Sequence, residues 1–532
     1  MTYLKNKKIA SLLIGMLTMC TLLTGCSNNN VSENVDELKN EIVFANFRDI
    51  RDPNPHLYGG EMWFQEMVYE TLVSVEETGI EPCLAESWEI SEDGLIYTFN
   101  IREGMTFSDG YVLDANAIEL NFDALWDNKE RHVWLESMNL ITSYYAKDDY
   151  TFVIELSGPY YPLLTELGVT RPFAMASPNV MKDGTTKDGV TEYIGSGPYV
   201  LTENVVNEYA IFEVNENYWG EVPEIEKVTM KVIPDNQARI IALENGEIDL
   251  IYGAELIDAE TLFSYENSEK FVSSTSEPLS TRHILLNTEN KILEDINVRY
   301  ALSHAVDKVM ISNGIFNGIE APADFLYAKS IPYCDVDLIP YEYDLELSKK
   351  YLEDSGWVVS SDGIREKDGE RLSFRILYDL DSVTGKNISE YLQAEFIKIG
   401  VELRLECFER ATYVDALKAG EFDIAHNISW GSPYDPESSL SAMTGRVYGD
   451  YAAQLNLPNK AELDSLIGSV FVTVDVDERQ DIYDEILTIL NDSAVYIPLT
   501  YQNNKSLYNN NIENVTYKPS QFTIPFWEMS IK

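Results

Sequence analysis

Arg131 and Trp134 are the first residues whose types and spacing suggest chemistry. They follow a segment in which Phe122, Leu125 and Trp126 recur at helical spacing. If that helix, or a further turn of it, continues, Arg131 and Trp134 share a face. A guanidinium is a planar fork that matches a carboxylate, and an indole ring can form the wall of a site for an apolar or cationic group. The pair therefore indicates a binding site.

A second arginine, Arg171, follows shortly after a Tyr160-Tyr161-Pro162 turn. Two arginines in one cleft would suit a ligand with two or more carboxylates. Spacing alone also allows a simpler interpretation, in which both arginines lie on solvated faces and Trp134 belongs to the core. Most charged side chains are exposed, so the spacing by itself favours that simpler interpretation.

The chain shows no pattern typical of a metal site of its own, so we expect no metal ion to be ligated directly. The three cysteines that follow residue 26 have neither C-x-x-C spacing nor a nearby histidine pair, and we expect buried thiols or at most one disulfide. A lone histidine is more often structural, although ligation by one of them stays open. These residues are Cys83, Cys334, Cys407, His56, His132, His283, His304 and His426.

Composition and motifs exclude several functions. The formal charge of −50 argues against nucleic acid, whose partners need basic surfaces, and against docking on anionic lipid. Neither H-E-x-x-H nor G-x-S-x-G occurs, and no carboxylate pair stands out among the 89 acidic residues. A secreted hydrolase remains the alternative from another class. We expect a binding protein with no enzymatic activity and no cofactor.

Residues 1–25 are typical of a signal peptide. Lys5, Lys7 and Lys8 form a basic region, and a mostly apolar run over 9–23 is too short for a comfortable membrane span. The run ends in Leu22-Leu23-Thr24-Gly25-Cys26, which resembles the lipobox of bacterial lipoproteins. The resemblance implies that Cys26 becomes the lipidated N-terminus on the outer face of the cell membrane, followed by a flexible tether over 26–39.

The remaining chain alternates strands and helices, which predicts an α/β fold. The clearest units are a strand over 228–233, a helix over 236–245 and a strand over 247–252, followed later by a similar unit over 372–405. At 532 residues the chain is too long for one core, so two lobes are expected. We assign 40–277 plus 496–532 to lobe one and 278–495 to lobe two, with two strand-like crossings between them.

Several short motifs resemble solute-binding protein family 5, which serves oligopeptide, dipeptide and nickel ABC importers. They occur in the order and spacing of that family and span nearly all of the chain after residue 40. The motifs are Ala85-Glu86-Ser87-Trp88, Ser91-Glu92-Asp93-Gly94, Phe107-Ser108-Asp109-Gly110, Gly195-Ser196-Gly197-Pro198-Tyr199, Asn215-Glu216-Asn217-Tyr218-Trp219 and Gly246-Glu247-Ile248-Asp249. The resemblance implies a two-lobed periplasmic-binding-protein-like fold, type II, large cluster C, with an extra subdomain in lobe one.

Other motifs resemble the nickel-binding branch of this family. They are Asn54-Pro55-His56-Leu57-Tyr58, Arg131-His132-Val133-Trp134-Leu135-Glu136, Arg171-Pro172-Phe173 and Trp430-Gly431-Ser432-Pro433-Tyr434-Asp435-Pro436. The branch implies a nickel–chelator ligand, or a related transition metal, and a monomer that serves an ABC permease and its ATPase. Position by position, the implied ligand-binding residues are Tyr58, Met62, Arg131, Trp134, Arg171, Trp430 and Tyr434.

The chain departs from this branch at one position. Known members place a metal-ligating histidine shortly after the Tyr-Asp-Pro segment, whereas residues 437–453 contain no histidine and the corresponding place falls near Tyr448. Nickel prefers imidazole or amine nitrogen to a phenol. We therefore expect the chelator to supply the ligands and Tyr448 to donate a hydrogen bond to it. A di- or oligopeptide-binding protein is the alternative.

Overall fold

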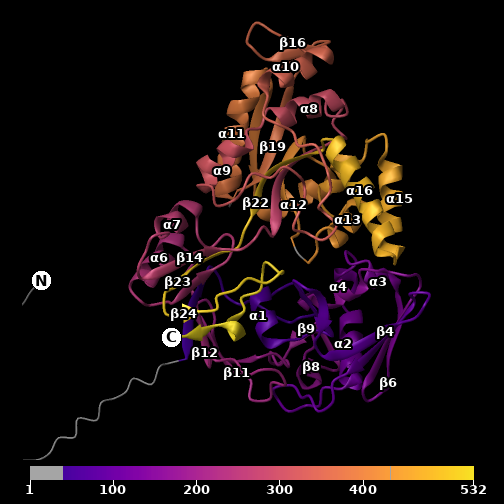
Figure 1. Cartoon of the computed structure of the whole chain (residues 1–532), viewed down its shortest axis with the longest axis vertical. Helices are drawn as coiled ribbons and strands as arrows, with labels where there is room; N and C mark the ends of the chain where they lie inside the picture. The colour runs from indigo at the N-terminus through magenta and orange to yellow at the C-terminus, as the bar shows by residue number, and fades with distance from the viewer. Residues whose placement is uncertain (1–39, 381, 432) are drawn as a thin grey trace, which may run out of the picture. The chain divides into compact units, whose positions relative to one another are not determined.

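The computed structural model describes residues 40–380, 382–431 and 433–532 (Figure 1). The expected signal peptide over 1–25, the tether over 26–39 and the lipidation site Cys26 lie outside the described residues. Within the described part of the chain, every helix is too short or too polar to span a lipid bilayer.

The first large sheet contains the predicted strand–helix–strand unit. Its seven strands lie in the order β10-β11-β12-β1-β13-β23-β14, and β1 pairs in parallel with both β12 and β13. Helix α6 connects β12 to β13 and begins after Asp235, whose carboxylate accepts a hydrogen bond from the Ala238 amide and so caps the helix. The elements are β1 (Glu41–Asn46), β10 (Tyr199–Val205), β11 (Tyr209–Val214), β12 (Lys227–Val232), α6 (Asn236–Glu244), β13 (Leu250–Tyr252), β14 (Phe271–Thr275) and β23 (Lys505–Asn509).

The second large sheet contains the later predicted unit. Its five strands lie in the order β20-β19-β21-β15-β22, with β19 parallel to both β20 and β21. The apolar side chains of helix α11 and of these strands share one core. The elements are β15 (Ser280–Leu286), β19 (Ser373–Asp379), α11 (Val383–Phe396), β20 (Glu402–Phe408), β21 (Ile424–Ile428) and β22 (Tyr496–Gln502). The predicted α/β fold is therefore confirmed.

Two short segments connect the large sheets, one leading from β14 to β15 and the other from β22 to β23 (Figure 1). They run side by side, because the Ser276 amide donates to the Asn504 carbonyl and the Leu279 amide donates to the Gln502 carbonyl, both at 2.9 Å. The expected lobe boundary at residue 496 falls at the start of β22, whose hydrogen bonds are made to β15. The lobe boundaries themselves stay a prediction.

A separate four-stranded sheet, in the order β4-β5-β7-β6, is formed by residues that lie between β1 and β10 of the first large sheet in the sequence. Helix α2 packs on it through Phe122, whose ring lies 4.9 Å from that of Phe152. These elements correspond to the extra subdomain implied by the family resemblance. They are β4 (Ala85–Ile90), β5 (Ile96–Ile101), α2 (Ala115–Trp126), β6 (Ile141–Asp148) and β7 (Thr151–Leu156).

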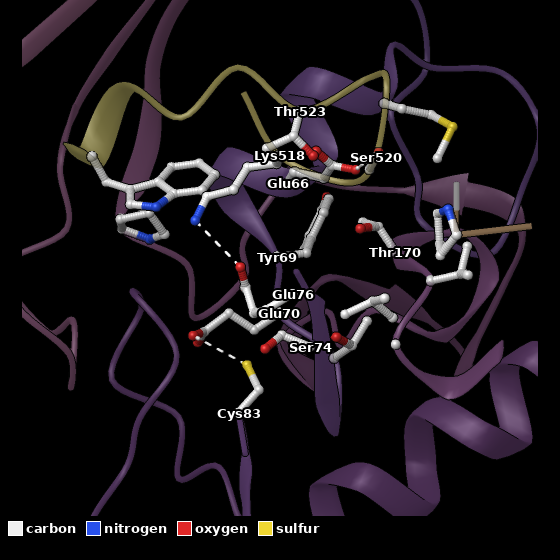
Figure 2. Close-up of a pocket in the computed structure, with 18 of the residues that line it drawn as sticks. Glu66, Tyr69, Glu70, Ser74, Glu76, Cys83, Thr170, Lys518, Ser520 and Thr523 are labelled. Atoms are coloured by element: carbon white, nitrogen blue, oxygen red, sulfur yellow. Dashed lines mark hydrogen bonds and ion pairs between the residues drawn. The ribbon is translucent and has the colours of Figure 1, made fainter. Parts of the chain in front are cut away.

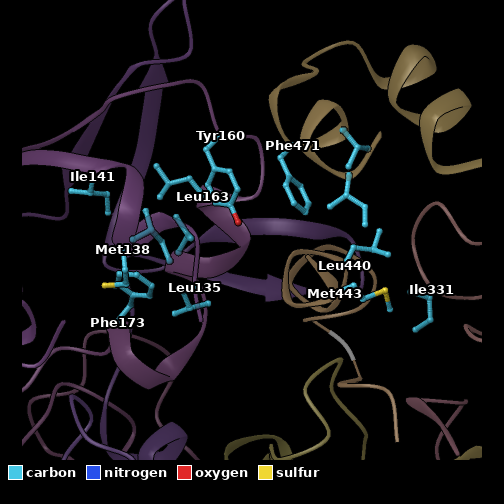
Figure 3. Close-up of a cluster of buried hydrophobic side chains, with 14 of the residues drawn as sticks. Leu135, Met138, Ile141, Tyr160, Leu163, Phe173, Ile331, Leu440, Met443 and Phe471 are labelled. Atoms are coloured by element: carbon cyan, nitrogen blue, oxygen red, sulfur yellow. The ribbon is translucent and has the colours of Figure 1, made fainter. Parts of the chain in front are cut away.

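A buried apolar cluster joins this subdomain to the helices that lie between β21 and β22 in the sequence (Figure 3). The Tyr160 ring lies 5.9 Å from the Phe471 ring, and the Tyr161 amide donates to the Phe471 carbonyl at 2.7 Å. The helices are α13 (Glu437–Met443), α14 (Asp450–Gln454), α15 (Lys460–Val472) and α16 (Val476–Asp492). Burial of these side chains stabilises the arrangement of segments that are far apart in the sequence.

The remaining helices and strands complete the described part of the chain. The helices are α1 (Met62–Val68), η1 (Lys129–Arg131), α3 (Ser137–Leu140), α4 (Leu163–Leu167), α5 (Thr170–Phe173), η2 (Pro178–Val180), α7 (Ala259–Ser264), α8 (Ile296–His304), α9 (Lys308–Phe316), α10 (Leu345–Asp354), η3 (Ile397–Ile399), α12 (Arg410–Ala419) and η4 (Phe526–Glu528). The strands are β2 (Val73–Glu76), β3 (Gly79–Pro82), β8 (Met181–Lys182), β9 (Thr185–Val190), β16 (Val358–Val359), β17 (Arg365–Lys367), β18 (Glu370–Arg371), β24 (Ile512–Glu513) and β25 (Ser530–Ile531).

The cysteines depart in part from expectation. Cys83, Cys334 and Cys407 are all free thiols. Cys334 is buried and Cys83 is half-buried, but Cys407 is exposed, so the prediction of a buried thiol is wrong for Cys407. Its strand, β20, lies at the edge of the second sheet, where a side chain can reach solvent.

Candidate functional site

Trp134 lies at the centre of a group of aromatic rings drawn from distant parts of the chain. Its ring centroid is 5.7 Å from that of Trp430, 6.0 Å from that of Tyr434 and 6.4 Å from that of Tyr58. Tyr448 joins through Trp430, at 6.1 Å. These separations are in the range of ordinary aromatic contacts, about 4.5–7 Å. We call Tyr58, Trp134, Trp430, Tyr434 and Tyr448 the aromatic cluster.

Loops position every member of the aromatic cluster. Tyr58 precedes α1, and Trp134 lies between η1 and α3, beside the four-stranded sheet. Trp430 and Tyr434 follow β21, and Tyr448 precedes α14, so these three come from the second half of the chain. Loops held on rigid elements are common places for binding residues. The aromatic cluster thus brings together five of the eight residues predicted for the site.

Arg171 lies against this aromatic cluster and is 9% exposed. Its guanidinium carbon is 5.7 Å from the centroid of the Tyr58 ring. Its Nη2 donates to the Gly60 carbonyl at 2.7 Å and to the Gln65 side-chain oxygen at 3.0 Å. Its Nε is buried and has no hydrogen-bond acceptor among the described residues. Burial lowers the pKa of Arg171 below its ordinary value.

An open donor on a buried guanidinium is unfavourable until an acceptor arrives. Leaving a buried charged donor unsatisfied costs roughly 1–3 kcal/mol or more. A carboxylate of a bound molecule could accept from the Nε of Arg171 and would counter its charge. Arg171 could therefore bind an anionic group of a ligand beside the aromatic cluster. We call Arg171 the anion anchor.

The other two predicted residues, Arg131 and Met62, lie outside the aromatic cluster. Arg131 is exposed in η1, and its charge acts on the imidazole of His132. Met62 is the first residue of α1 and lines a cavity that Tyr434 also lines. The expected convergence of Arg131 and Arg171 on one ligand stays a prediction, as do the roles of the other predicted residues.

His132 supports the aromatic cluster in a way that its sequence position did not reveal. Its ring stacks on the Tyr58 ring at 5.0 Å with an interplanar angle of 29°, and its Nε2 lies 2.9 Å from the His56 carbonyl oxygen. The side chain is fully buried, which lowers its pKa to about 4 and keeps the imidazole neutral near pH 7. It positions Tyr58 without adding charge.

The histidines are otherwise occupied by structural hydrogen bonds. One ring nitrogen of each lies within 3.1 Å of a hydroxyl or carbonyl oxygen, in the pairs His56 with Thr186, His283 with Thr281, His304 with Glu342 and His426 with Ser389. Among residues 40–532, apart from positions 381 and 432, no three His, Cys, Asp or Glu side chains are grouped to hold a metal ion.

A cavity of about 290 Å³ opens next to Met62 and Tyr434 (Figure 2). We call it the side cavity. Its polar lining includes three carboxylates and one ammonium group, and its wall is partly aromatic. The lining includes Glu66, Tyr69, Glu70, Glu76, Lys518 and Trp219. Sequence reasoning missed the side cavity because one glutamate among 89 acidic residues carries no signal of its surroundings.

Comparison with known proteins identifies the family. Residues 79–449 match the model of bacterial extracellular solute-binding proteins, family 5 Middle. The chain is 38% identical over 477 residues to the nickel-binding periplasmic protein of Escherichia coli K12, covering 89% of this chain and 91% of that protein. It is 25% identical over 484 residues to the oligopeptide-binding protein AppA of Bacillus subtilis 168, covering 87% and 86% of the two chains.

A solved structure agrees with these sequence matches. The structure of NikA from Brucella suis in complex with Fe(III)-EDTA superposes with a TM-score of 0.90 at 40% identity, covering 92% of this chain and all of that one. The predicted two-lobed fold and the resemblance to the nickel-binding branch are therefore confirmed. Proteins of this family bind solutes for transport and are not enzymes, which excludes the hydrolase alternative.

The motifs, the fold and these matches agree along most of the chain, and together they show that it belongs to family 5 of the bacterial extracellular solute-binding proteins, two-lobed proteins that bind a solute outside the cytoplasm for an ABC importer.

Proposed function

We propose that this protein captures nickel, or a related transition metal, as a complex with a small chelator that carries carboxylates. It then delivers the complex to an ABC permease and its ATPase. The observation that carries the proposal is the buried guanidinium of Arg171, whose Nε lacks an acceptor among the described residues and which lies against the aromatic cluster. A carboxylate of the chelator is the acceptor that this geometry suits.

The metal is proposed to arrive already complexed. A positive guanidinium beside the site repels a bare dication. Imidazole and amine nitrogens suit nickel better than carboxylates or phenols. A chelator with its own nitrogen would supply these ligands, and its carboxylates would offset the positive charge of the metal. Tyr448 then contacts the chelate as a hydrogen-bond donor and not as a metal ligand. The relatives support this proposal, since one is named for nickel and another was solved with a metal held by a polycarboxylate.

Capture is proposed to involve movement of the two lobes about the paired crossing segments. Tyr58 follows β1 of the first sheet and Trp134 precedes β6 of the four-stranded sheet, whereas Trp430 and Tyr434 follow a strand of the second large sheet. A ligand between these rings would contact both lobes, and closure around it would exclude water. We propose that the protein does this as a monomer, held at the outer face of the cell membrane by lipid on Cys26.

The alternative is a di- or oligopeptide ligand, as in the Bacillus subtilis relative named above. A peptide needs an acidic partner for its α-amino group as well as a cation for its carboxylate. Glu66 is close enough to Arg171 for the two charges to interact, so a carboxylate near the anion anchor exists. Peptides therefore belong in any binding test.

Calorimetric titration of metal-stripped protein tests the proposal. We expect tight one-to-one binding of nickel premixed with excess L-histidine or of Fe(III)-EDTA, and weak binding of nickel chloride. Arg171→Ala should weaken chelate binding at least roughly tenfold, about 1.4 kcal/mol, because the carboxylate loses a charge-assisted partner. Arg404→Ala removes an exposed arginine from β20 and serves as the matched control with unchanged affinity.

Two outcomes would count against this function. Equal chelate affinity in Arg171→Ala and the parent would mean that the guanidinium does not contact the ligand. Tight binding of a dipeptide, with no binding of either chelate, would favour the peptide alternative.

A further inference from the structure

The side cavity contains carboxylates that the proposed chelate site does not use. Its single lysine, Lys518, is already paired. Its Nζ lies 3.3 Å from Glu76, an ion pair marked in Figure 2, and it also lies 2.5 Å from Glu528. Two further carboxylates, Glu66 and Glu70, line the same cavity. Within the described ranges, neither forms an ion pair with a lysine, arginine or histidine within 4.0 Å. The side cavity thus has two carboxylates that the described residues leave without a direct ion pair.

Neutral donors hold these two carboxylates in place. The Trp219 indole donates to both oxygens of Glu70 at 3.0 Å, and the Cys83 thiol lies 3.8 Å from one of them. The Ser520 hydroxyl donates to Oε1 of Glu66 at 3.2 Å, while Oε2 is buried and finds no donor in the part of the chain that the structure describes. An acceptor left open in this way suits an incoming N–H group.

A second open group lines the same space. Tyr69 is 3% exposed, and its hydroxyl is buried without a hydrogen-bond partner in residues 40–380, 382–431 and 433–532. Figure 2 draws its side chain between Glu66 and Glu70. The wall also includes the rings of Tyr218, Trp219 and Trp527. Aromatic faces next to carboxylates form a favourable environment for an organic cation.

Two lining residues link the side cavity to the proposed chelate site. Met62 and Tyr434 line the cavity, and both belong to the set of predicted ligand-binding residues. The charge of Arg171 acts on Glu66, so the anion anchor and the open carboxylate are electrostatic neighbours. A molecule with a carboxylate at Arg171 could therefore extend a positive arm past Met62 towards Glu66. The volume of about 290 Å³ is near the lower end of ordinary ligand pockets, roughly 300–1,000 Å³.

We propose that the side cavity is a subsite for a protonated amine arm of the chelator, received by Glu66 and Glu70. The inference rests on the proposed chelate function and narrows its substrate class. The ligand would have two poles, with carboxylates at Arg171 and a free ammonium group in the side cavity. Simple polycarboxylates would then be incomplete ligands that bind more weakly.

Proton release offers a second readout of this arrangement. Burial raises the pKa of Glu66 to about 7, against the opposing effects of the Thr523 and Ser520 hydroxyls and the charge of Arg171. Tyr434 and Tyr252, from other elements, also face this carboxyl group. An ammonium group favours the ionised carboxylate. Binding of an amine-bearing chelate near pH 7 should therefore release protons from Glu66.

The experiment compares two nickel chelates that differ in one group. Both are EDTA derivatives substituted on the ethylene backbone, one with an aminobutyl arm and the other with a plain butyl arm. Calorimetry on the parent should show at least roughly tenfold tighter binding of the aminobutyl chelate. For that chelate alone, the heat should depend on the ionisation enthalpy of the buffer. Glu66→Gln should reduce the preference to less than about threefold and abolish the buffer dependence.

Controls separate this inference from the proposed function. Butyl chelate that still binds Glu66→Gln shows that the variant is folded, and Glu70→Gln provides a second test of the same subsite. Glu89→Gln, at an exposed position of β4, should retain the full preference. Equal affinity of the parent for both chelates would overturn the amine subsite alone. Binding of neither chelate would overturn the chelate function, and the amine subsite with it.

Discussion

Arg171 and Arg131 have the same side chain but different surroundings, and the surroundings decide their chemistry. Arg171 is buried, donates to Gly60 and Gln65 and has an open Nε, whereas Arg131 is exposed in η1. Interactions of a buried charge are weakly screened by solvent, so an anion gains far more from a buried guanidinium than from an exposed one. Burial thus makes Arg171 the stronger candidate for ligand contact.

A different buried charge, Glu166, should make stability depend on pH. It is 1% exposed, accepts from the Tyr160 hydroxyl at 2.7 Å and from the Ser137 amide at 3.2 Å, and lies near the carboxyls of Glu437 and Glu136. Burial raises its pKa to about 7. In the unfolded chain the same carboxyl ionises near its ordinary value of about 4.3.

The direction of the change in stability with pH depends on whether the folded or the unfolded state binds the Glu166 proton more tightly. Between these two pKa values the folded state retains the proton and the unfolded state releases it, so the free energy of unfolding falls as pH rises. The slope is at most about 1.4 kcal/mol per pH unit for this group. We expect chemical denaturation to show a smaller loss of stability between pH 5.5 and 7.5 in Glu166→Gln than in the parent. Glu86→Gln, at an exposed position, should behave like the parent, and an unchanged slope in Glu166→Gln would contradict the assignment.

At the scale of elements, strands β15 and β22 of the second sheet adjoin the two segments that connect the sheets, and a buried charge network lies where these strands pair. Arg282 of β15 donates to the Glu320 carboxylate at 2.8 Å and 3.1 Å and also pairs with Glu255. Thr500 of β22 donates to Glu320 at 2.7 Å, and Gln502 donates to Glu255 at 2.7 Å. The contacts with Glu255 join β15 and β22 to the loop that follows β13.

Removing the cation from this network should be strongly destabilising. Glu320 is fully buried, so Arg282→Met would remove the cation that forms an ion pair with its carboxylate, at a cost of roughly 3–5 kcal/mol in the free energy of unfolding. Because Glu320→Gln removes the unpaired charge, the double variant should recover part of that loss. Urea denaturation measures both changes.

The matched control is Lys349→Met, which removes the partner of a largely exposed carboxylate, Glu346. Surface pairs of this kind contribute less than about 1 kcal/mol. A double variant no more stable than Arg282→Met alone would show that the unpaired charge of Glu320 is not the source of the loss.

At the scale of the whole molecule, the chain combines an N-terminal segment with a two-lobed binding unit. The binding unit begins with β1 at Glu41, and the expected lipidation site lies before it in the sequence. A diacylglycerol group with an N-terminal acyl chain supplies more than one hydrocarbon chain, which is enough for stable anchoring. The expected tether would then allow the binding unit to meet its permease while attached to the membrane.

Replacement of one sulfur atom tests the anchor. Cys26→Ser should move the protein from the membrane fraction to the medium or the soluble fraction, because serine cannot form the thioether to the lipid. Cell fractionation with immunodetection measures the change. Cys407→Ser, at an exposed thiol in the binding unit, should remain with the membrane. Unchanged membrane retention of Cys26→Ser would contradict lipid attachment at that residue.

The sequence by itself determined the element types and the family. Periodic apolar residues and capping side chains such as Asp235 act over a few positions, so the strand–helix–strand units could be predicted from local pattern. Family motifs such as Gly195-Ser196-Gly197-Pro198-Tyr199 are also local, and they carried the identification of the fold. Trp134 and Trp430 were assigned to the predicted site because they lie in such motifs. Nothing in the sequence indicated that the two residues are close in space.

Only the tertiary structure decided which of these residues meet and which are buried. Trp134 and Trp430 come together because distant loops pack against one another, and no local pattern encodes that contact. Arg171 and Arg131 looked alike in sequence, yet packing buries one and leaves the other in solvent. Packing buries the Glu66 carboxyl group, which raises its pKa and leaves one of its oxygens without a donor among the described residues. Burial and electrostatics depend on all neighbours in space, which is why the side cavity could not be predicted from the order of residues.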